Sequence, residues 1–176
     1  LLSLLALPLG HYIAAVFRDG PVSGWPGRIL GPLERLVLRL IGAHTGQESR
    51  WPAYARDLVV FSVVCTAGVY LLQRLQGLLP ANPAELPSVS PLLALNTAIS
   101  FASNTNWQAY GGETTLSYLI QAAGLGVQNF VSAAAGLAVL IALVRGLTRQ
   151  GTDTIGNFWV DLTRGTVYLL IPLSIV

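Results

Sequence analysis

Residues 90–112 read SPLLALNTAISFASNTNWQAYGG, and this stretch decides the fold. Ser90 followed by Pro91 is a typical helix start, with serine as the N-cap and proline at the first helical position. The apolar run that follows predicts a helix over 91–102, which is too short to cross a bilayer. The next stretch, 103–112, is polar, uncharged and poor in helix formers. A short helix followed by a polar extended stretch indicates a re-entrant loop, which is tolerated at membrane depth only where it is buried in protein or lines a watery cavity.

The composition is that of an integral membrane protein. Hydrophobic residues make up 53% of the 176 residues and charged residues only 10%, against roughly 25% charged in an ordinary soluble domain. A soluble domain of this length has too much surface for so few charges, and a disordered chain is poor in apolar residues. The net charge of +2 gives no support to nucleic-acid binding.

Four apolar segments are candidate membrane spans, because about 20 apolar residues of helix cross the hydrocarbon core. They occupy residues 1–17, 58–79, 114–144 and 166–176. As a straight helix the third would be roughly 46 Å long, so we expect it to tilt, bend or project beyond the bilayer. Its plausible bend points are Gly124, Gly126 and Gly136. The first and last segments lie at the limits of the sequence, so we expect a piece of a longer protein with both spans truncated.

The arginines predict the orientation in the membrane. Residues 18–57 contain six of the 10 basic residues, all of which are arginine, and residues 145–165 contain three. Only Arg74 lies at the opposite end of a span, and residues 80–113 contain none. By the positive-inside rule, 18–57 and 145–165 are cytoplasmic loops and 80–113 is an extracellular re-entrant segment.

Within the first predicted cytoplasmic loop, residues 32–41 have the pattern of an amphipathic helix. Pro32 suits the first helical position, and Glu34, Arg35 and Arg39 share the side opposite the apolar residues. We expect the helix to lie at the membrane interface. A surface helix that covers the span ends is favoured over a lipid-specific site.

A short helix and a polar loop between two spans form the unit from which potassium-type channels build a selectivity filter. A dehydrated cation needs several oxygens at short range, and uncharged oxygens bind weakly enough for the ion to leave again. The negative end of the helix dipole lies near Ala102, where the cation would sit. Side-chain amides at Asn104, Asn106 and Gln108 add further neutral oxygens.

Several motifs carry a resemblance to a known family. Residues 104–118, NTNWQAYGGETTLSY, are similar to the first filter loop of the potassium-binding A subunit of the Kdp potassium-transporting ATPase. The sequences LNTAISF at 95–101, AGLGVQNF at 123–130 and GNFWVDL at 156–162 follow in the order that this family shows. The resemblance covers nearly the whole chain.

The resemblance implies a filter and its residues. The filter and potassium-binding residues would be Asn104, Thr105, Asn106, Trp107 and Gln108. Within the loop no glycine precedes Gly111, unlike the Thr-Val-Gly-Tyr-Gly pattern of tetrameric potassium channels. We therefore expect the Gln108 side chain to take over work that backbone does elsewhere.

The family also implies a fold and a function. The fold would be an all-α polytopic membrane protein of the potassium-channel-like transporter type, with four span–loop–span units in one chain. The function would be that of the potassium-binding and translocating subunit of an ATP-driven, high-affinity potassium importer in the bacterial inner membrane. ATP would be hydrolysed by a separate catalytic P-type ATPase subunit, and two small subunits would complete the complex. We expect no catalytic residue, no metal site other than that for potassium and no further cofactor in this chain.

Two rival functions are weighed against the importer. A passive potassium channel, or a Trk-like potassium transporter without an ATPase partner, needs the same filter. A non-transporting membrane scaffold is more remote, because it leaves the uncharged re-entrant segment without a purpose.

Other polar residues have two readings each. Glu113 at the pore mouth either caps the following span or raises the local cation concentration, and capping is favoured. For Gln121, Gln128 and Asn129, interhelical hydrogen bonding is favoured over lining the ion path.

The acidic residues of the second predicted cytoplasmic loop are expected to be helix caps or solvated groups. They are Asp153 and Asp161. Asp161 also lies three residues before Arg164, which is the spacing of an ion pair on one helix face.

Overall fold

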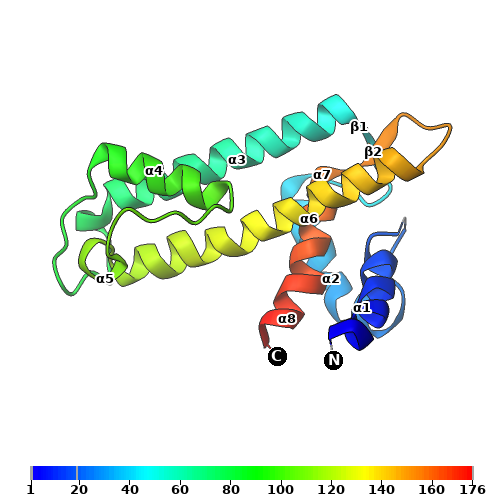
Figure 1. Cartoon of the computed structure of the whole chain (residues 1–176), viewed down its shortest axis with the longest axis horizontal. Coiled ribbons are helices and arrows are strands. Elements are labelled where there is room, and N and C mark those ends of the chain that lie inside the picture. Colours follow the sequence, from blue (N-terminus) through cyan, green and yellow to red (C-terminus); the bar gives the residue numbers. More distant parts are fainter. Residues whose placement is uncertain (1, 19, 176) are drawn as a thin grey trace. The chain divides into compact units, whose positions relative to one another are not determined.

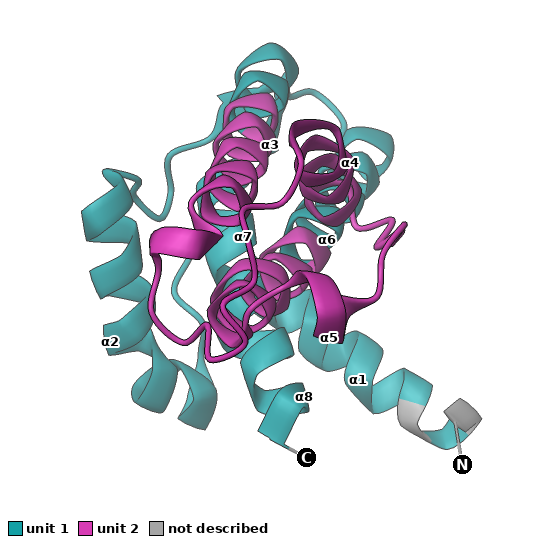
Figure 2. Ribbon diagram, turned by 90° about the vertical axis from the view of Figure 1, so that its left-hand side faces the viewer, with its two compact units in different colours: residues 1–57, 134–176 teal, residues 58–133 magenta. Residues whose placement is uncertain are grey.

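The computed structural model describes residues 2–18 and 20–175, and the chain forms two compact units. Unit 1 comprises residues 1–57 and 134–176, and unit 2 comprises residues 58–133 (Figure 2). Most of the described chain is helical, and the strands β1 and β2 pair to form a short two-stranded ribbon (Figure 1). The helical character expected from the sequence is confirmed.

In unit 1, α2 packs antiparallel to the continuous helix formed by α7 and η3. Its elements are α1 (Leu2–Val16), α2 (Gly24–Ile41), β1 (Ser49–Arg50), the start of α3 (Trp51–Arg74), the larger part of α6 (Val127–Thr148), β2 (Thr154–Gly156), α7 (Phe158–Arg164), the π-helical turn η3 (Gly165–Leu170) and α8 (Ile171–Ile175). Leu38 of α2 packs with Val160, Glu34 contacts Arg164, and Leu30 packs on the apolar cluster that contains Tyr168. Residue numbers in these contacts decrease along α2 while they increase along α7 and η3, so the two helices are antiparallel.

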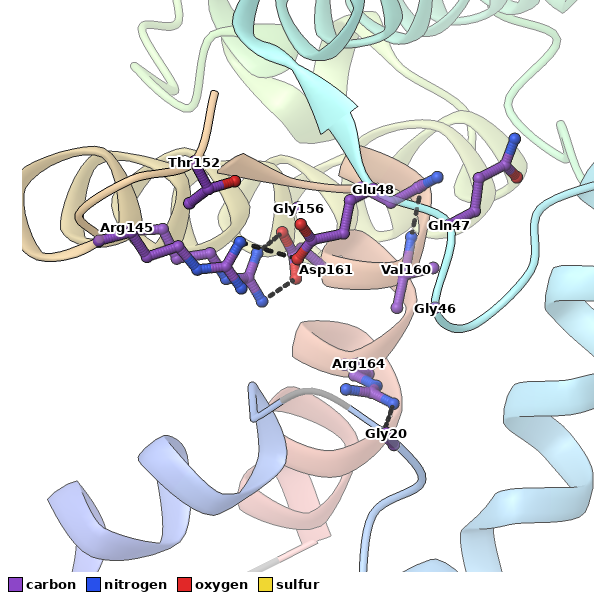
Figure 3. A pocket seen from close by; sticks show the side chains of 12 residues that line it. Gly20, Gly46, Gln47, Glu48, Arg145, Thr152, Gly156, Val160, Asp161 and Arg164 are labelled. Atoms are coloured by element: carbon purple, nitrogen blue, oxygen red, sulfur yellow. Dashed lines mark hydrogen bonds and ion pairs between the residues drawn. The ribbon is translucent and has the colours of Figure 1, made fainter. Parts of the chain in front are cut away.

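A buried ion pair joins α2 to α7. Arg164 donates to Glu34 at 2.9 Å, and the two side chains are only 4% and 6% exposed. Glu34 also accepts a hydrogen bond from the Tyr168 hydroxyl at 2.7 Å. The Arg164 guanidinium also donates to the backbone carbonyl of Arg18 and to that of Gly20 (Figure 3). One arginine therefore fixes α2, α7 and the turn between α1 and α2.

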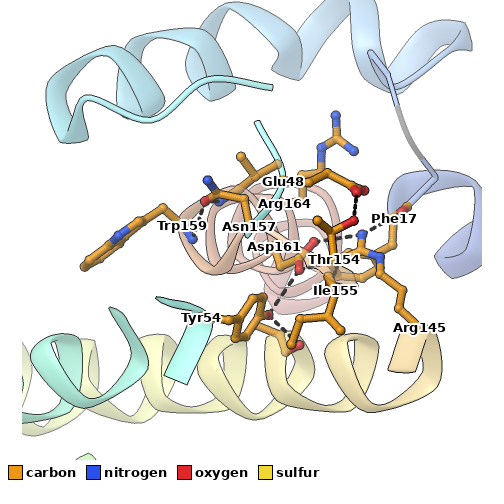
Figure 4. Close-up of polar contacts among 12 residues, drawn as sticks. Phe17, Glu48, Tyr54, Arg145, Thr154, Ile155, Asn157, Trp159, Asp161 and Arg164 are labelled. Carbon is orange, nitrogen blue, oxygen red and sulfur yellow. Dashed lines mark hydrogen bonds and ion pairs between the residues drawn. The ribbon is translucent and has the colours of Figure 1, made fainter. Parts of the chain in front are cut away.

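A second ion pair closes the other side of α7. Arg145, near the end of α6 (Val127–Thr148), contacts both carboxylate oxygens of Asp161 at 2.6 and 3.1 Å. The same guanidinium donates to the Phe17 carbonyl at 3.0 Å. Tyr54 donates its hydroxyl to Asp161 at 3.1 Å (Figure 4). Asp161 is 1% exposed, and these partners compensate the cost of burying its charge.

These contacts correct three expectations. Asp161 is neither a helix cap nor a solvated group, because the cap of α7 is Asn157, whose Oδ1 accepts from two backbone N–H groups at the helix start. Asp161 pairs with Arg145 and not with Arg164. Glu34 does not share the solvated face of its helix, since it is buried against Arg164. In each case a tertiary partner outweighs the local spacing.

The ribbon is held by charged and hydroxyl side chains. β1 and β2 pair antiparallel, with Ser49 opposite Gly156. Glu48, which precedes β1, accepts hydrogen bonds from the Thr154 hydroxyl and from Arg149. The hydrogen bond from Thr154 is the largest cause that lowers the pKa of Glu48 below its usual range, and the hydrogen bond and positive charge of Arg149 lower it further.

Unit 2 packs a short helix between two long ones. It contains most of α3 (Trp51–Arg74), the 3-10 turn η1 (Gln76–Leu78), α4 (Pro91–Ala102), α5 (Gly112–Thr115), the π-helical turn η2 (Ile120–Gly126) and the start of α6. Ala94 and Ala98 of α4 are fully buried, and Phe101 is 2% exposed. They pack with Val69 of α3 and Ile120 of η2 in one apolar cluster. The small side chains allow close approach of α4 to its neighbours.

In the part of the chain that the structure describes, two helices are long and apolar enough to cross a membrane. They comprise residues Trp51–Arg74, with 24 residues, and Ile120–Thr148, with 29 residues. At 1.5 Å per residue they are about 36 and 44 Å long, against a hydrocarbon core of about 30 Å. α3 leaves apolar side chains such as Val59, Val63 and Val64 exposed, as a helix does when lipid or other protein surrounds it.

The observed helices differ from the expected segments at their starts. α3 begins at Trp51 and not at 58, because Pro52 favours the first turn of a helix. The apolar segment that was expected to run from 114 to 144 is interrupted at residues 116 and 117, and the long helix begins only after them. Two of the expected bend points, Gly124 and Gly126, lie in the π-helical turn η2, a feature that commonly kinks helices.

The amphipathic helix is longer than expected. α2 begins at Gly24, after Ser23 in extended conformation, so Pro32 lies inside the helix and not at its first position. Pro26 and Gly31 are buried, and this packing against the rest of unit 1 compensates for the hydrogen bond that Pro32 cannot donate.

Substitution at Gly156 tests the second ion pair. Gly156 has φ +105°, and an added Cβ would meet Arg145 Nη1 at 2.1 Å. Gly156→Ala should lower the free energy of unfolding by about 2–4 kcal/mol through backbone strain and a displaced ion pair. The control Gly151→Ala has φ +75° with nothing within 4 Å of its added Cβ, and should cost about 1 kcal/mol. Thermal unfolding of the complete protein in detergent measures both, and equal losses would contradict the assigned contact.

Candidate functional site

The loop after α4 folds back onto the end of that helix. The Ser100 carbonyl accepts the backbone N–H of Thr105 at 2.9 Å and that of Asn106 at 3.1 Å. The Ser103 hydroxyl also donates to it at 3.2 Å. A helix end normally leaves its last carbonyls without partners. Here the loop supplies the partners, so the predicted filter segment is part of the helix end.

The two asparagines of the loop adopt left-handed backbone conformations. Asn104 and Asn106 each have φ 57°. Among residues other than glycine, asparagine enters this region most readily. The alternation Asn-Thr-Asn therefore allows two sharp changes of chain direction without a glycine, which accounts for the absence of glycine before Gly111.

The structure brings the predicted filter residues together in one exposed loop. All five of them, Asn104, Thr105, Asn106, Trp107 and Gln108, are exposed. Asn104 Oδ1 accepts a hydrogen bond from the Ser132 hydroxyl of α6 at 3.3 Å. Among the described residues, no hydrogen bond is recorded for the side-chain amides of Asn106 and Gln108, so their oxygens are accessible.

Gln76 is a residue of this site that the sequence did not single out. It is fully buried, and its amide nitrogen donates to the carbonyls of Pro87 at 2.8 Å and Thr115 at 3.0 Å. Its amide oxygen accepts the N–H of Ser117 at 2.8 Å. One side chain thus ties the entry to α4 to the exit from the loop. The only sequence signal was a glutamine at the end of an apolar segment.

The end of α3 holds the entry to α4 by further contacts. Gln73 is fully buried and donates to the Ala94 carbonyl of α4 at 3.2 Å. Arg74 donates to the Val89 carbonyl, and Val89 donates its N–H to the Gln73 carbonyl at 3.2 Å. These bonds satisfy irregular backbone before α4, which an apolar environment requires.

The remaining predicted polar residues have different environments. Gln121 donates to the carbonyls of Gly112 at 3.2 Å and Leu116 at 2.8 Å, so it stabilises the loop exit. Glu113 is exposed in the first turn of α5. It is separated from the long helix and is not positioned to cap it. Asn129 is exposed, whereas Gln128 is 4% exposed.

Buried polar atoms without partners are concentrated around α4. In the described residues they include side-chain atoms of Gln73, Ser100 and Ser117, all of unit 2. Burying an unpartnered polar group in an apolar environment is costly. The surroundings of α4 are therefore polar to a degree that simple helix packing does not explain.

Unit 1 contains a polar pocket of about 380 Å³ lined by three arginines. Arg145 is paired with Asp161 (Figure 3). Arg164 is paired with Glu34 and Arg149 with Glu48. Each positive charge therefore has a carboxylate partner within the unit. These ion pairs hold the elements of unit 1 together, and among the described residues the three arginines carry no uncompensated charge that would attract an anion.

Comparisons with known proteins agree with the sequence pattern. A family model described as "Potassium-transporting ATPase A subunit" matches residues 1–176. A relative from Sorangium cellulosum, named potassium-transporting ATPase potassium-binding subunit, is 58% identical over 98% of this chain and 29% of its own length. Relatives of the same name from Methylococcus capsulatus and Herpetosiphon aurantiacus are 55% and 54% identical over 97% of this chain, and over 28% and 29% of their own lengths. The chain thus spans less than a third of these curated relatives.

Removal of the Gln76 side chain tests the clamp around α4. Gln76→Ala leaves two carbonyls and one N–H without partners, at about 1–3 kcal/mol for each group that stays buried. We expect thermal unfolding of the complete protein to show a loss of about 2–4 kcal/mol. The control Gln47→Ala removes an exposed glutamine and should stay within about 0.5 kcal/mol of the parent. A Gln76 variant as stable as its control would remove the clamp from the account.

Proposed function

Because the chain belongs to the family of potassium-transporting ATPase A subunits, we propose that it contributes a potassium-selective filter to an ATP-driven potassium importer. The observation that carries the proposal is the loop of neutral oxygens at the C-terminal end of α4. Asn104, Thr105, Asn106, Trp107 and Gln108 form the potassium-binding segment, and α4 acts as its pore helix.

The chemistry of the loop suits a large monovalent cation. Backbone carbonyls and the Gln108 amide are neutral ligands, whereas divalent cations usually recruit carboxylates. Between positions 86 and 152 of the sequence the one acidic residue is Glu113, which directly follows the Gly111–Gly112 pair. Its exposed carboxylate raises the cation concentration at the mouth without binding the ion in the filter.

The end of α4 contributes electrostatically. The negative end of the helix dipole lies at Ala102, and the hydrogen bonds to Ser100 hold the loop against this end. A cation bound by residues 104–108 is therefore stabilised by the helix as well as by its direct ligands. Gln76 and Gln121 act as positioning residues, because they fix the backbone on either side of the loop.

The importer divides its work among subunits. The relatives are named as potassium-binding subunits of a potassium-transporting ATPase. Accordingly, this chain binds and conducts potassium in the bacterial inner membrane, a separate P-type ATPase subunit hydrolyses ATP, and two small subunits complete the complex. A passive channel or a Trk-like transporter would use a similar loop. The ATPase named in the relatives' descriptions favours the importer.

The proposal includes a membrane topology. Loops 18–57 and 145–165 lie in the cytoplasm and the segment 80–113 outside, as the nine arginines against one indicate. The spans are 1–17, 58–79, 114–144 and 166–176. The helices of the second and third spans comprise residues Trp51–Arg74 and Ile120–Thr148. The potassium path thus begins at the extracellular loop.

A fixed positive charge in the loop tests the filter. In the complete transporter, Gln108→Arg should raise the potassium concentration for half-maximal uptake by roughly tenfold or more, which corresponds to about 1.4 kcal/mol, because the guanidinium competes with the cation. The control Ala84→Arg adds the same charge at an exposed position of the preceding loop and should change uptake little. Unchanged uptake by Gln108→Arg at limiting potassium would exclude this residue from the site.

Cysteine labelling tests the topology. Cysteines at Glu85 and Glu113 should react with membrane-impermeant reagents in intact cells. Cysteines at Glu48 and Asp153 should react only after permeabilisation. Labelling of position 48 in intact cells would overturn the orientation that the arginines predict.

A further inference from the structure

α2 presents two exposed stripes that the ion site does not use. One is apolar, with Trp25, Ile29, Leu33, Leu36 and Leu40 between 40% and 78% exposed. Their spacing of three or four residues places them on one side of the helix. The opposite side, with Pro26, Gly31, Glu34 and Leu38, is buried in unit 1.

The second stripe is basic. Arg28, Arg35 and Arg39 are exposed and lie seven and four residues apart, so they line the edge of the apolar stripe. Among the described residues, no hydrogen bond or ion pair is recorded for these three side chains. The one acidic residue of α2, Glu34, is already neutralised by Arg164. The exposed surface of α2 thus carries uncompensated positive charge, in contrast to the paired arginines of the polar pocket.

Each stripe leads into a cavity of matching character. Near the C-terminal end of α2, a cavity of about 280 Å³ is lined by Arg35, Arg39, His44, Thr45, Leu38 and Ala43. Near the N-terminal end, an apolar groove of about 430 Å³ includes Trp25 and Ile29 of α2, Tyr12 of α1 and Leu173 of α8. Arg39 lies ten positions after Ile29, which is a rise of about 15 Å along the helix axis. One acyl chain covers this length, because it spans half of the roughly 30 Å hydrocarbon core.

We propose that α2 is a binding site for an anionic glycerophospholipid of the cytoplasmic leaflet. The phosphate lies in the cavity of Arg35, Arg39 and His44, and an acyl chain follows the apolar stripe into the groove at Trp25 and Ile29. Charge complementarity selects this occupant. A zwitterionic lipid would bring its own cation to the arginines, and an apolar protein helix alone would leave them unpaired. The arginine pattern assigns the adjoining loop to the cytoplasmic side, where anionic lipid attracts basic segments.

Photo-crosslinking in vesicles tests the lipid site. The complete complex is reconstituted in vesicles of unlabelled phosphatidylcholine with a small amount of a photoreactive probe lipid. The probe carries a diazirine on its acyl chain and is phosphatidylglycerol in one sample and phosphatidylcholine in the other. Adducts are then mapped to peptides. The phosphatidylglycerol probe should label peptides from residues 25–41 severalfold more than the phosphatidylcholine probe. Equal labelling by the two headgroups would contradict an anionic site.

Charge variants separate the specific site from general attraction. Each arginine near an anionic surface contributes roughly fivefold to partitioning, so Arg35→Gln with Arg39→Gln should lower phosphatidylglycerol labelling of this segment by about 25-fold. Arg35→Lys with Arg39→Lys should retain most of it. The control, Arg18→Gln with Arg50→Gln, removes two exposed charges of the same predicted loop, of which Arg50 is paired with Asp153 at 3.5 Å, and should retain the labelling.

The alternative occupants give distinct results. Size-exclusion chromatography first shows that each variant complex is assembled. If neither lipid labels residues 25–41 while other apolar segments of the complex are labelled, the stripe is covered by protein and the proposal is overturned. Equal loss of labelling in the double glutamine variant and in its control would also overturn it. The test does not depend on the ion site, because its readout is lipid labelling and not potassium uptake.

Discussion

Backbone that is neither helix nor sheet can lie in an apolar environment only if side chains satisfy its hydrogen bonds, and unit 2 is organised by this constraint. The segments before α4 and after the loop are irregular, and glutamines bind both. Gln76 connects three backbone groups from the two segments, and Gln121 holds the loop exit. Because an amide is both donor and acceptor and carries no charge, glutamine does this without adding a fixed charge beside the proposed potassium site.

Unit 1 uses charge where unit 2 uses amides. Arg164 and Arg145 are each paired with a carboxylate, and both also donate to backbone carbonyls at the end of α1 or in the turn that follows it. A buried ion pair is often no more stabilising than apolar packing, but removal of one partner is costly. Such pairs therefore fix which surfaces meet. As a result, α2 is held with its basic and apolar stripes exposed, as the proposed lipid site requires.

The sequence predicted what local pattern determines. The helix start at Ser90-Pro91, the polar loop and the membrane character followed from composition and spacing, and the family was recognised from residues 104–118 and is confirmed by the comparisons. It did not predict partners that are distant in sequence. Asp161 pairs with Arg145 and Glu34 with Arg164, 130 residues away. Gln76 gave no sign of its three contacts, because nothing in a sequence states which backbone groups a fold leaves unpaired.

The central claim is that residues 104–108 bind the transported ion at the end of α4. The most direct test is a structure of the complete complex with rubidium or thallium in place of potassium, since both scatter strongly enough to be located. The account predicts ion density in contact with oxygens of residues 104–108, on the helix axis beyond Ala102. Ion density confined to other parts of the protein, with this loop in contact only with bulk water, would contradict it.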